Sequence, residues 1–376
     1  MSTLMPMVDP KGLLEYSVVF NDRSLNHMAP AFQQIMRDIA STLKRVYQAD
    51  AIAIVPGSGT FGMEAVARQF ATDKTCLIIR NGWFSYRWTQ IFETGGIAKK
   101  EIVLKARPLT DAVDSAFEPP ALETVLAVIR SEKPDLLFAA HVETAAGMIL
   151  PDFYLKAVAD AVHEVGGLFI LDCIASGAAW VDMKATGVDI LLSAPQKGWS
   201  ASPCCALVML SPRAHKRIET TKSTSFAGDL LKWLQIMKAY EAGGYAYHAT
   251  MPTDALARFH GAMREMEELG FGVTRDRQWE LGTKARAAFA KRGYKSTAAE
   301  GFEAPGVLVH FTQNDAVQNG KAFAELGLQT AAGVPLMCDE GPGFKTFRLG
   351  LFGLDKLAHI DRTVKLMEDA LERLPR

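Results

Sequence analysis

The sequence has no excess of charge of either sign. It contains 41 Lys and Arg against 42 Asp and Glu, which gives a formal net charge of −1 when the eight His residues are neutral. Nucleic acids and anionic membrane surfaces attract proteins through a net positive field. We therefore expect neither a nucleic acid nor a membrane as a partner.

Long hydrophobic runs and paired cysteines are also missing. No apolar run approaches the roughly 18–20 residues that cross a membrane, and no basic patch followed by an apolar core marks a signal peptide near the N-terminus. The five Cys residues form no C-x-x-C pair, and the adjacent Cys204 and Cys205 are poorly placed for an ordinary disulfide. These absences predict a cytoplasmic protein with reduced thiols.

Repeats and low-complexity segments are absent as well, which excludes fibrous and disordered classes. The 376 residues are 49% hydrophobic and 22% charged, an ordinary globular mixture that can bury a large core. The length suits one large domain or two modest ones.

Short apolar runs alternate with helix-like segments along the first two thirds of the chain. The apolar runs lie at 51–55, 77–79, 136–140, 168–171, 190–192 and 206–210, and helical patterns cover 31–47, 62–70 and 152–165. Wholly apolar strands separated by helices are typical of a mostly parallel sheet covered on both faces. The pattern therefore predicts an α/β fold.

The rhythm changes after about residue 270. A strand is predicted at 307–311, another begins near Phe347, and a final helix is predicted over 355–374. We expect an N-terminal arm over 1–25, a large domain over 26–269 and a small α+β domain over 270–376.

A glycine-rich loop follows the first strand. The segment 57–62 fits G-x-G-x-x-G between a strand and a helix, where backbone N–H groups and the helix dipole favour a phosphate. A dinucleotide site usually adds an acidic residue about 20 positions later, at the end of the second strand, where this chain has Arg80. A phosphate cradle is favoured over a nicotinamide site or a merely structural turn.

Two charged residues follow buried strands. Asp172 closes the strand at 168–171, and Lys197 comes just after the strand at 190–192. The carboxyl ends of strands in open α/β sheets are where ligands bind. A lone Lys is most often solvated, but a phosphate cradle, an aspartate and a lysine together are what pyridoxal phosphate requires.

With these motifs the chain resembles the class V aminotransferases of the fold-type-I pyridoxal phosphate enzymes, closest to the alanine–glyoxylate and serine–glyoxylate branch. The resemblance runs from Asn26 to the C-terminus and rests on GSGT at 57–60, N-G-x-F-x-x-R at 81–87, H-x-E-T-x-x-G at 141–147, L-D at 171–172, S-x-x-Q-K at 193–197 and R-L-G-L-F-G at 348–353. It implies a large domain with a seven-stranded, mostly parallel sheet and a smaller C-terminal α+β domain. It also implies transfer of an amino group between a small amino acid and a 2-oxo acid, of the alanine-, serine- or aspartate–glyoxylate or –pyruvate type.

The resemblance assigns roles to the charged residues. Lys197 would hold the cofactor as an internal aldimine and shuttle the α-proton, and Asp172 would pair with the protonated pyridine nitrogen. Such a pair near 4 Å is worth roughly 4 kcal/mol at an effective dielectric of 20. Arg348 would grip the α-carboxylate of the substrate.

Other positions match cofactor contacts of the family. The phosphate would be bound by Ser58, Gly59, Thr60 and Gln196. Phe84 takes the place of an aromatic, usually Trp, that stacks on the cofactor ring, with Trp83 and Trp88 as alternatives one register away. Thr144 would contact the ring oxygen. For His141 and Glu143 two alternatives stay open: a role in the site, or a structural role as hydrogen-bonded polar residues.

The segment 243–252 matches a stretch that reaches the phosphate of the partner subunit in this branch. Tyr247 and Thr250 carry the match, and they imply a homodimer with two shared active sites; a loop in which Tyr247 packs locally is the alternative. A phosphate has about two charges and three acceptor oxygens, more than residues 58–60 satisfy alone.

Two features depart from the branch. The N-terminal segment lacks the usual Pro-Gly-Pro stretch, so Tyr16 and Ser17 are candidates for new substrate contacts. Cys338 lies ten residues before Arg348, which keeps a lyase or desulfurase with a cysteine nucleophile as an alternative; such chains place their cysteine in a longer loop further upstream. A nicotinamide oxidoreductase is a more remote alternative, because it leaves Lys197 unexplained.

Overall fold

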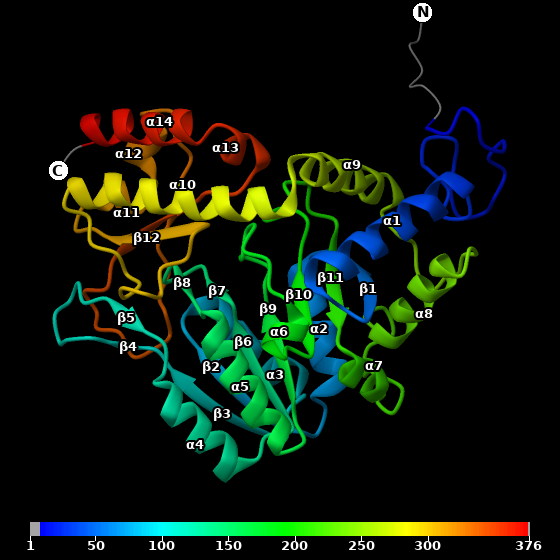
Figure 1. Ribbon diagram of the computed structural model, residues 1–376, viewed down its shortest axis with the longest axis horizontal. Helices are drawn as coiled ribbons and strands as arrows, with labels where there is room; N and C mark the ends of the chain where they lie inside the picture. The colour runs from blue at the N-terminus through cyan, green and yellow to red at the C-terminus, as the bar shows by residue number, and fades with distance from the viewer. Residues whose placement is uncertain (1–7, 375–376) are drawn as a thin grey trace, which may run out of the picture.

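The computed structural model describes residues 8–374, and its centre is a seven-stranded sheet (Figure 1). The strand order is β1-β11-β10-β9-β6-β2-β3. The strands are β1 (Ala51–Pro56), β2 (Thr75–Arg80), β3 (Lys100–Lys105), β6 (Leu136–Ala140), β9 (Leu168–Asp172), β10 (Ile190–Ser193) and β11 (Cys205–Leu210).

The sheet is parallel from β10 to β3 and antiparallel only around β11, which runs against both β10 and β1. All six apolar runs predicted as strands lie in it. Strand β3 was not predicted, because its three apolar residues, 102–104, are flanked by the charged Lys100, Glu101 and Lys105 at the edge of the sheet, where burial is only partial. The α/β prediction with a mostly parallel sheet is confirmed.

Helices cover the sheet on its two faces. Helix α2 packs against β1, β10 and β11, α3 against β2 and β6, α5 against β9, and α1 and α8 against β1. The helices of this region are α1 (Pro30–Tyr47), α2 (Gly59–Phe70), α3 (Trp83–Gly95), α4 (Leu122–Glu132), α5 (Asp152–Glu164), α6 (Met183–Thr186), α7 (Pro212–Ile218), α8 (Leu230–Glu241) and α9 (Thr253–Leu269). Two short hairpins, β4 (Arg107–Pro108) with β5 (Phe117–Glu118) and β7 (Val142–Glu143) with β8 (Met148–Ile149), complete it.

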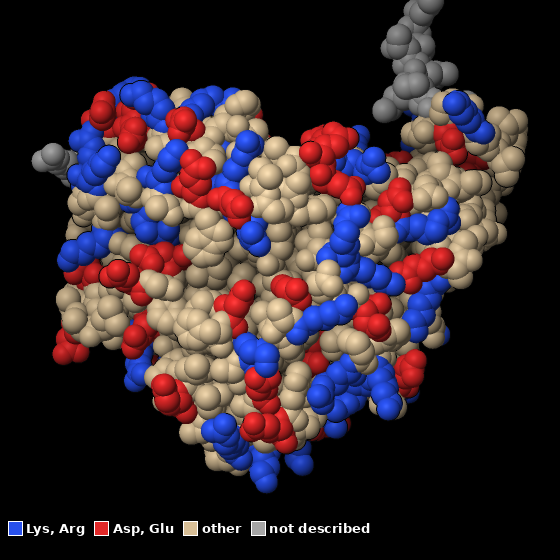
Figure 2. Space-filling model, viewed as in Figure 1, with Lys and Arg blue, Asp and Glu red and all other residues tan. Residues whose placement is uncertain are grey.

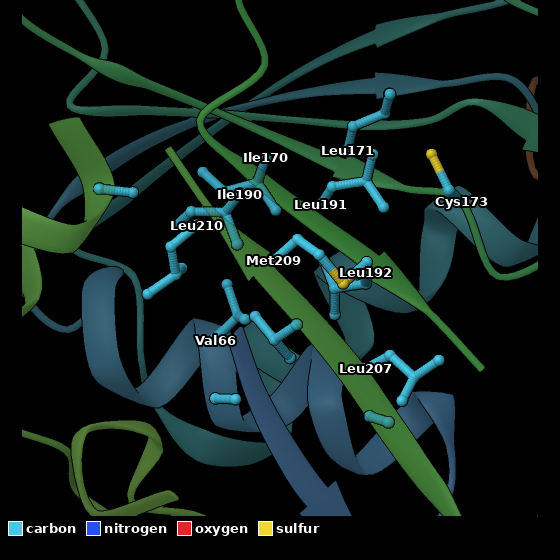
Figure 3. Packing of buried hydrophobic residues seen from close by; sticks show 14 of the residues in the cluster. Val66, Ile170, Leu171, Cys173, Ile190, Leu191, Leu192, Leu207, Met209 and Leu210 are labelled. Atoms are coloured by element: carbon cyan, nitrogen blue, oxygen red, sulfur yellow. The ribbon is translucent and has the colours of Figure 1, made fainter. Parts of the chain in front are cut away.

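The largest hydrophobic core lies between the middle strands and their helices. Figure 3 shows Leu191, Leu192 and Met209 of adjacent strands and Val66 of α2 in one cluster of buried side chains. These side chains are no more than 1% exposed. Because both faces of these strands are covered, their runs contain no alternating polar residues, and the strand ends are held in fixed positions.

The C-terminal part has its own sheet, in the order β12-β14-β13. In Figure 1 the long helix α10 crosses above β12, with α14 beside it. The elements are α10 (Phe271–Lys291), β12 (Val307–Phe311), α11 (Asp315–Gln318), α12 (Lys321–Ala324), β13 (Ala331–Ala332), β14 (Thr346–Gly350), α13 (Leu354–Ala358) and α14 (Ile360–Arg373). The single final helix predicted over 355–374 is wrong: it breaks at His359, whose ψ of 60° is not helical. A division into domains at residue 270 stays a prediction, although Gly270, between α9 and α10, has a φ of +95° that favours glycine.

The surface carries both signs of charge side by side. In Figure 2 blue and red side chains are interspersed over the visible face. Within residues 8–374, no helix combines the length and the apolar character that a membrane crossing needs. All five Cys residues are free and buried.

Candidate active site

Three strand ends meet at one edge of the sheet. In the parallel register, Asp172 at the end of β9 lies between Ala140 of β6 and Leu192 of β10. Lys197 follows the end of β10 by four residues. The topology therefore brings the carboxylate and the amine, 25 residues apart in sequence, to the same edge.

The turn that carries Lys197 depends on a glycine. A Cβ at Gly198 would lie 2.1 Å from the carbonyl oxygen of Gly177, so only glycine permits this close approach of two backbone segments. Two residues further on, Ser200 Oγ accepts a hydrogen bond of 2.9 Å from Leu354 N at the start of α13. The turn that carries Lys197 is thus fixed both to the segment after β9 and to the start of α13 in the C-terminal part.

The glycine-rich loop leads directly into α2, which begins three residues earlier than predicted, at Gly59. Ser58 is the N-cap residue in extended conformation, and its side chain makes no capping hydrogen bond. The first backbone N–H groups of a helix have no partner within the helix. This end of α2 therefore offers unpaired donors and a free hydroxyl to an anion.

These segments enclose one cavity, which we call the strand-end cavity. It is lined by Ser58, Gly59, Thr60, Phe84, Arg87, Val142, Thr144, Asp172, Ile174, Ala175, Gln196 and Lys197. Eight of the twelve are residues that the sequence assigned to the cofactor. The structure thus brings most of the candidate set together from segments spread over 140 residues.

Two buried polar atoms of this cavity have no hydrogen-bond partner within the described chain, Thr144 Oγ1 and Gln196 Oε1. Leaving buried polar groups unpaired costs roughly 1–3 kcal/mol each. Thr144 Oγ1 can donate to an oxygen of the cofactor ring, and the amide of Gln196 can turn to present its N–H₂ group to a phosphate oxygen. The residues present therefore fit a bound pyridoxal phosphate.

The ionisable groups of the cavity are perturbed by burial. Burial raises the pKa of Asp172 to about 6, against a hydrogen bond of 2.8 Å that its Oδ1 accepts from Ile174 N. Burial lowers the pKa of Lys197, Asp172 opposes that shift, and Arg348 and Arg87 add to it. A buried carboxylate that resists ionisation gains most from a cation placed beside it.

One aromatic residue faces the lysine from α3. The amine of Lys197 lies 5.8 Å from the ring centre of Phe84 and 5.7 Å from that of Phe352. Of the alternatives, Trp88 is fully buried and packs on Phe138, and Trp83 packs on Tyr86; neither lines the strand-end cavity.

Glu143 has a structural part in placing Phe84. Its carboxylate accepts hydrogen bonds from the backbone N–H groups of Phe84 and Ser85, from Ser85 Oγ and from Ala145 N, at 2.7–3.1 Å. A Cβ at Gly82 would lie 2.7 Å from the Glu143 side chain, so the glycine lets the carboxylate reach the start of α3. Acidic side chains are favourable at a helix N-terminus.

His141 is also buried away from the cavity. Its Nδ1 lies 2.7 Å from Ser176 Oγ, and burial lowers its pKa to about 4. The ring is neutral at physiological pH, and its hydrogen bond ties the segment after β6 to the segment after β9.

Arg348 lies inside β14. Its Nε donates a hydrogen bond of 2.8 Å to the carbonyl of Ala332, and its guanidinium lies 5.6 Å from the ring centre of Phe84. Within residues 8–374, no carboxylate oxygen lies within 4 Å of its nitrogens, which leaves its terminal amino groups available to an anionic ligand.

Besides Arg348, four of the predicted site residues do not line the strand-end cavity of their own chain. Tyr247 and Thr250 are joined by a hydrogen bond of 3.1 Å, and Tyr247 also packs on His27. Tyr16 and Ser17 line a different cavity, formed by the N-terminal segment. Their roles stay predictions.

Cys338 and Arg80 have structural surroundings. The Cys338 thiol is buried and donates to the carbonyl of Arg80, and burial raises its pKa to about 12, opposite to what a cysteine nucleophile needs. Arg80 is buried and lies outside the strand-end cavity, and its Nη2 donates a hydrogen bond of 2.6 Å to Thr89 Oγ1. Neither residue supports the desulfurase or the nicotinamide alternative.

Sequence reasoning assigned no role to Arg87, although it ends the motif at 81–87. It is three residues after Phe84, and positions three apart share a face of a helix. Its guanidinium lies 5.1 Å from the Phe84 ring centre, and its Nη1 donates to Thr60 Oγ1 at 3.0 Å. The three-residue spacing between Phe84 and Arg87 in the sequence was the signal that could have predicted a place for Arg87 in this site.

Comparisons with known proteins agree with this geometry. An alanine–glyoxylate aminotransferase of Saccharomyces cerevisiae is 27% identical over 69% of this chain and 67% of its own, and an L-aspartate–glyoxylate aminotransferase of Paracoccus denitrificans is 24% identical over 73% and 67%. The crystal structure of an alanine–glyoxylate aminotransferase from Nostoc sp. superposes with a TM-score of 0.75 at 23% identity, covering 93% of this chain and 89% of that one.

These likenesses confirm the predicted resemblance and fold, and they do not favour the lyase alternative. A family model described as "Aminotransferase class-V" matches residues 13–314, about four fifths of the chain. The chain therefore belongs to the class V aminotransferase family.

Proposed function

We propose that this protein is a pyridoxal phosphate-dependent enzyme that transfers an amino group between a small amino acid and a 2-oxo acid. The observation that carries the proposal is the strand-end cavity, with Asp172 and Lys197 on its walls and two unpartnered polar atoms, Thr144 Oγ1 and Gln196 Oε1. We further propose that the enzyme is a cytoplasmic homodimer.

The cavity residues divide into those that hold the cofactor and those that act on the substrate. Residues 58–60 would hold the phosphate, Phe84 would cover one face of the ring, and Thr144 would bond its oxygen substituent. Pyridoxal phosphate supplies an electron sink for the charge that appears when an α-proton leaves an amino acid.

Asp172 keeps that sink effective. Its carboxylate would hold a proton on the pyridine nitrogen, and burial makes the attraction between the two stronger than in water. Because its pKa near 6 reflects burial, a cation opposite would bring the carboxylate back to its ionised form.

Lys197 moves the proton. Its Nζ would attach the cofactor covalently and, once released, take the proton from the substrate α-carbon. Burial and two neighbouring arginines lower its pKa, so a larger fraction of the amine is neutral and able to accept a proton at physiological pH.

Arg348 would orient the substrate. Its Nε is fixed on the Ala332 carbonyl, and its terminal amino groups suit a carboxylate in a two-bond arrangement. The relatives named above take different amino donors, alanine and aspartate, with glyoxylate in both names. We propose glyoxylate as the first acceptor to test and leave the donor to a panel.

The test is the visible spectrum of the purified protein and its response to borohydride. Loss of the visible band on reduction, with a pyridoxyl group found by mass spectrometry on the peptide that contains Lys197, is the expected result. In a separate sample without borohydride, adding single amino acids should bleach the band in proportion to amino transfer. A colourless protein that binds no added cofactor, or an adduct on another lysine, contradicts the proposal.

The homodimer rests on Tyr247 and Thr250, whose hydroxyl groups bond each other on a surface where Tyr247 is 53% exposed. Mixing Lys197→Ala with the double variant Tyr247→Ala/Thr250→Ala should restore one complete site per mixed dimer. The expected gain is activity in mixtures of two inactive parents. An active wild type that sediments as a monomer, or mixed dimers without a gain, would refute shared sites.

A further inference from the structure

One cation of the strand-end cavity has no partner of opposite charge. The nitrogens of Arg87 lie more than 4 Å from every carboxylate oxygen within residues 8–374, and its one side-chain hydrogen bond goes to Thr60 Oγ1. A half-buried guanidinium without a carboxylate is poorly compensated. Its position on the cavity wall indicates that an anion completes its surroundings.

The two arginines near Phe84 are held at different places. Arg348 is fixed from β14 through the Ala332 carbonyl, whereas Arg87 is fixed at the start of α2 through Thr60. Both guanidinium groups lie within 6 Å of the same ring centre. An anion held by the glycine-rich loop would meet Arg87 through its contact with Thr60, whereas Arg348 is held away from that loop on β14.

We propose that Arg87 is a phosphate-binding residue that supplies a permanent positive charge to the cofactor phosphate from within the same subunit. The inference rests on the proposed function. On this proposal, the positive charge at the phosphate comes from α3 of the same chain. The other donors are neutral: the hydroxyl groups of Ser58, Thr60, Tyr247 and Thr250. Arginine offers several donors in a fixed plane, which suits a phosphate with three acceptor oxygens.

The test compares the affinity for pyridoxal phosphate with that for pyridoxal, which lacks the phosphate, after the cofactor has been dialysed out of the full-length protein. Arg87→Gln should weaken the binding of pyridoxal phosphate about 10- to 100-fold, the range for one lost hydrogen-bonded charge. Its affinity for pyridoxal should stay within about threefold of the wild type, because the lost contact is to the phosphate alone. Arg87→Lys should recover part of the loss.

Arg68→Gln is the matched control. Arg68 is also half-buried, near a threonine hydroxyl (Thr224), but it pairs with Glu64 and lies outside the strand-end cavity. The control removes the same charge and should leave both affinities unchanged.

The other outcomes overturn the proposal in distinct ways. An equal loss for both ligands assigns Arg87 to the structure of α3. An unchanged affinity for the cofactor, with a weaker response only to dicarboxylic donors such as aspartate, assigns it to the substrate. If the wild type binds neither ligand, the proposed function itself fails.

Mixed dimers test whether Arg87 acts within its own subunit. Lys197→Ala mixed with Arg87→Gln leaves no site that has both residues in one chain, so no gain over the parents is expected. A gain like that expected for the Tyr247 and Thr250 variant would mean that Arg87 acts across the interface.

Discussion

The strand-end cavity and the cavity of the N-terminal segment differ in how they are built. The first, about 120 Å³, takes its walls from five segments anchored on the sheet. The second, which we call the arm cavity, is about 270 Å³ and is lined only by residues between Val8 and Pro30. The larger cavity comes from one continuous stretch of chain.

Their charges differ as well. The arm cavity is lined by Asp9, Glu15 and Asp22 and, among the described residues, by no cation. The strand-end cavity has Arg87 and Lys197 around a single carboxylate. A phosphate or a substrate carboxylate is attracted to the strand-end cavity and repelled by the arm cavity. Position at the strand ends and sign of charge therefore indicate the site better than volume does.

The two regions also differ in what the side chains contribute to the fold. Tyr16 is 89% exposed and Leu13 92%, whereas Asp172 is 7% exposed. Changes in the strand-end cavity should therefore alter chemistry or stability strongly, and changes in the arm should alter stability little. Variants at Lys197 and Tyr16 test this contrast.

Replacing Lys197 by Ala should have the largest effect. Loss of the group that attaches the cofactor and moves the proton should reduce turnover by about 10³-fold or more, while the circular dichroism spectrum stays that of the wild type. Lys184→Ala, an exposed lysine of α6, is the control. Residual turnover above a tenth of the wild type would remove Lys197 from the mechanism.

Asp172→Asn should keep the size of the side chain and lose the charge. Losing a few kcal/mol of transition-state stabilisation corresponds to about 10²-fold in rate. Turnover should be measured at saturating cofactor, with occupancy checked from the spectrum. Full activity at confirmed occupancy would show that this carboxylate does not hold the ring proton.

The same variant should change the pH dependence of stability. In the cofactor-free protein, the pKa of Asp172 is raised from 3.8 to about 6, so the folded state binds its proton more tightly than the unfolded state. Ionising it between about pH 4 and pH 6 therefore lowers the free energy of unfolding, by about 3 kcal/mol in this window. Denaturant unfolding of wild type and Asp172→Asn should diverge as the pH rises through it; parallel curves would contradict the shift.

Glu143→Gln should mainly reduce stability. In the wild type, backbone N–H groups donate to both oxygens of the Glu143 carboxylate. The amide of Gln replaces one of these acceptor oxygens by an N–H₂ donor, so the free energy of unfolding should fall by about 1–3 kcal/mol. Glu132→Gln, which breaks a surface ion pair with Lys100, is the control and should cost less than about 1 kcal/mol. Equal losses in the two variants would mean that the start of α3 does not depend on Glu143.

Tyr16→Ala should have the smallest effect on stability, within about 0.5 kcal/mol, because the side chain is exposed. The same variant tests the proposal that Tyr16 contacts the substrate. A higher KM for the amino donor at unchanged stability supports that contact, and an unchanged KM removes Tyr16 from the site.

Much of this protein follows from local pattern. The apolar runs predict six strands of the central sheet, and the glycine-rich loop, Asp172 and Lys197 follow strands by position alone, because parallel strands share one carboxyl edge. The same pattern did not predict the edge strand β3, whose short apolar centre is flanked by charged residues, or the break of the final helix at His359. Partial burial at an edge and local backbone geometry leave weak signals in sequence.

The sequence by itself determined the family, the fold and the types of residue that the chemistry needs. Only the tertiary structure decided which of them meet. It left Tyr16 and Ser17 on the arm, buried Cys338 and His141, assigned Glu143 to the start of α3, and brought Arg87 to Thr60. The reason is physical: spacing fixes the face of a helix or the end of a strand, but distances between segments far apart in sequence arise only when the sheet and its helices pack together.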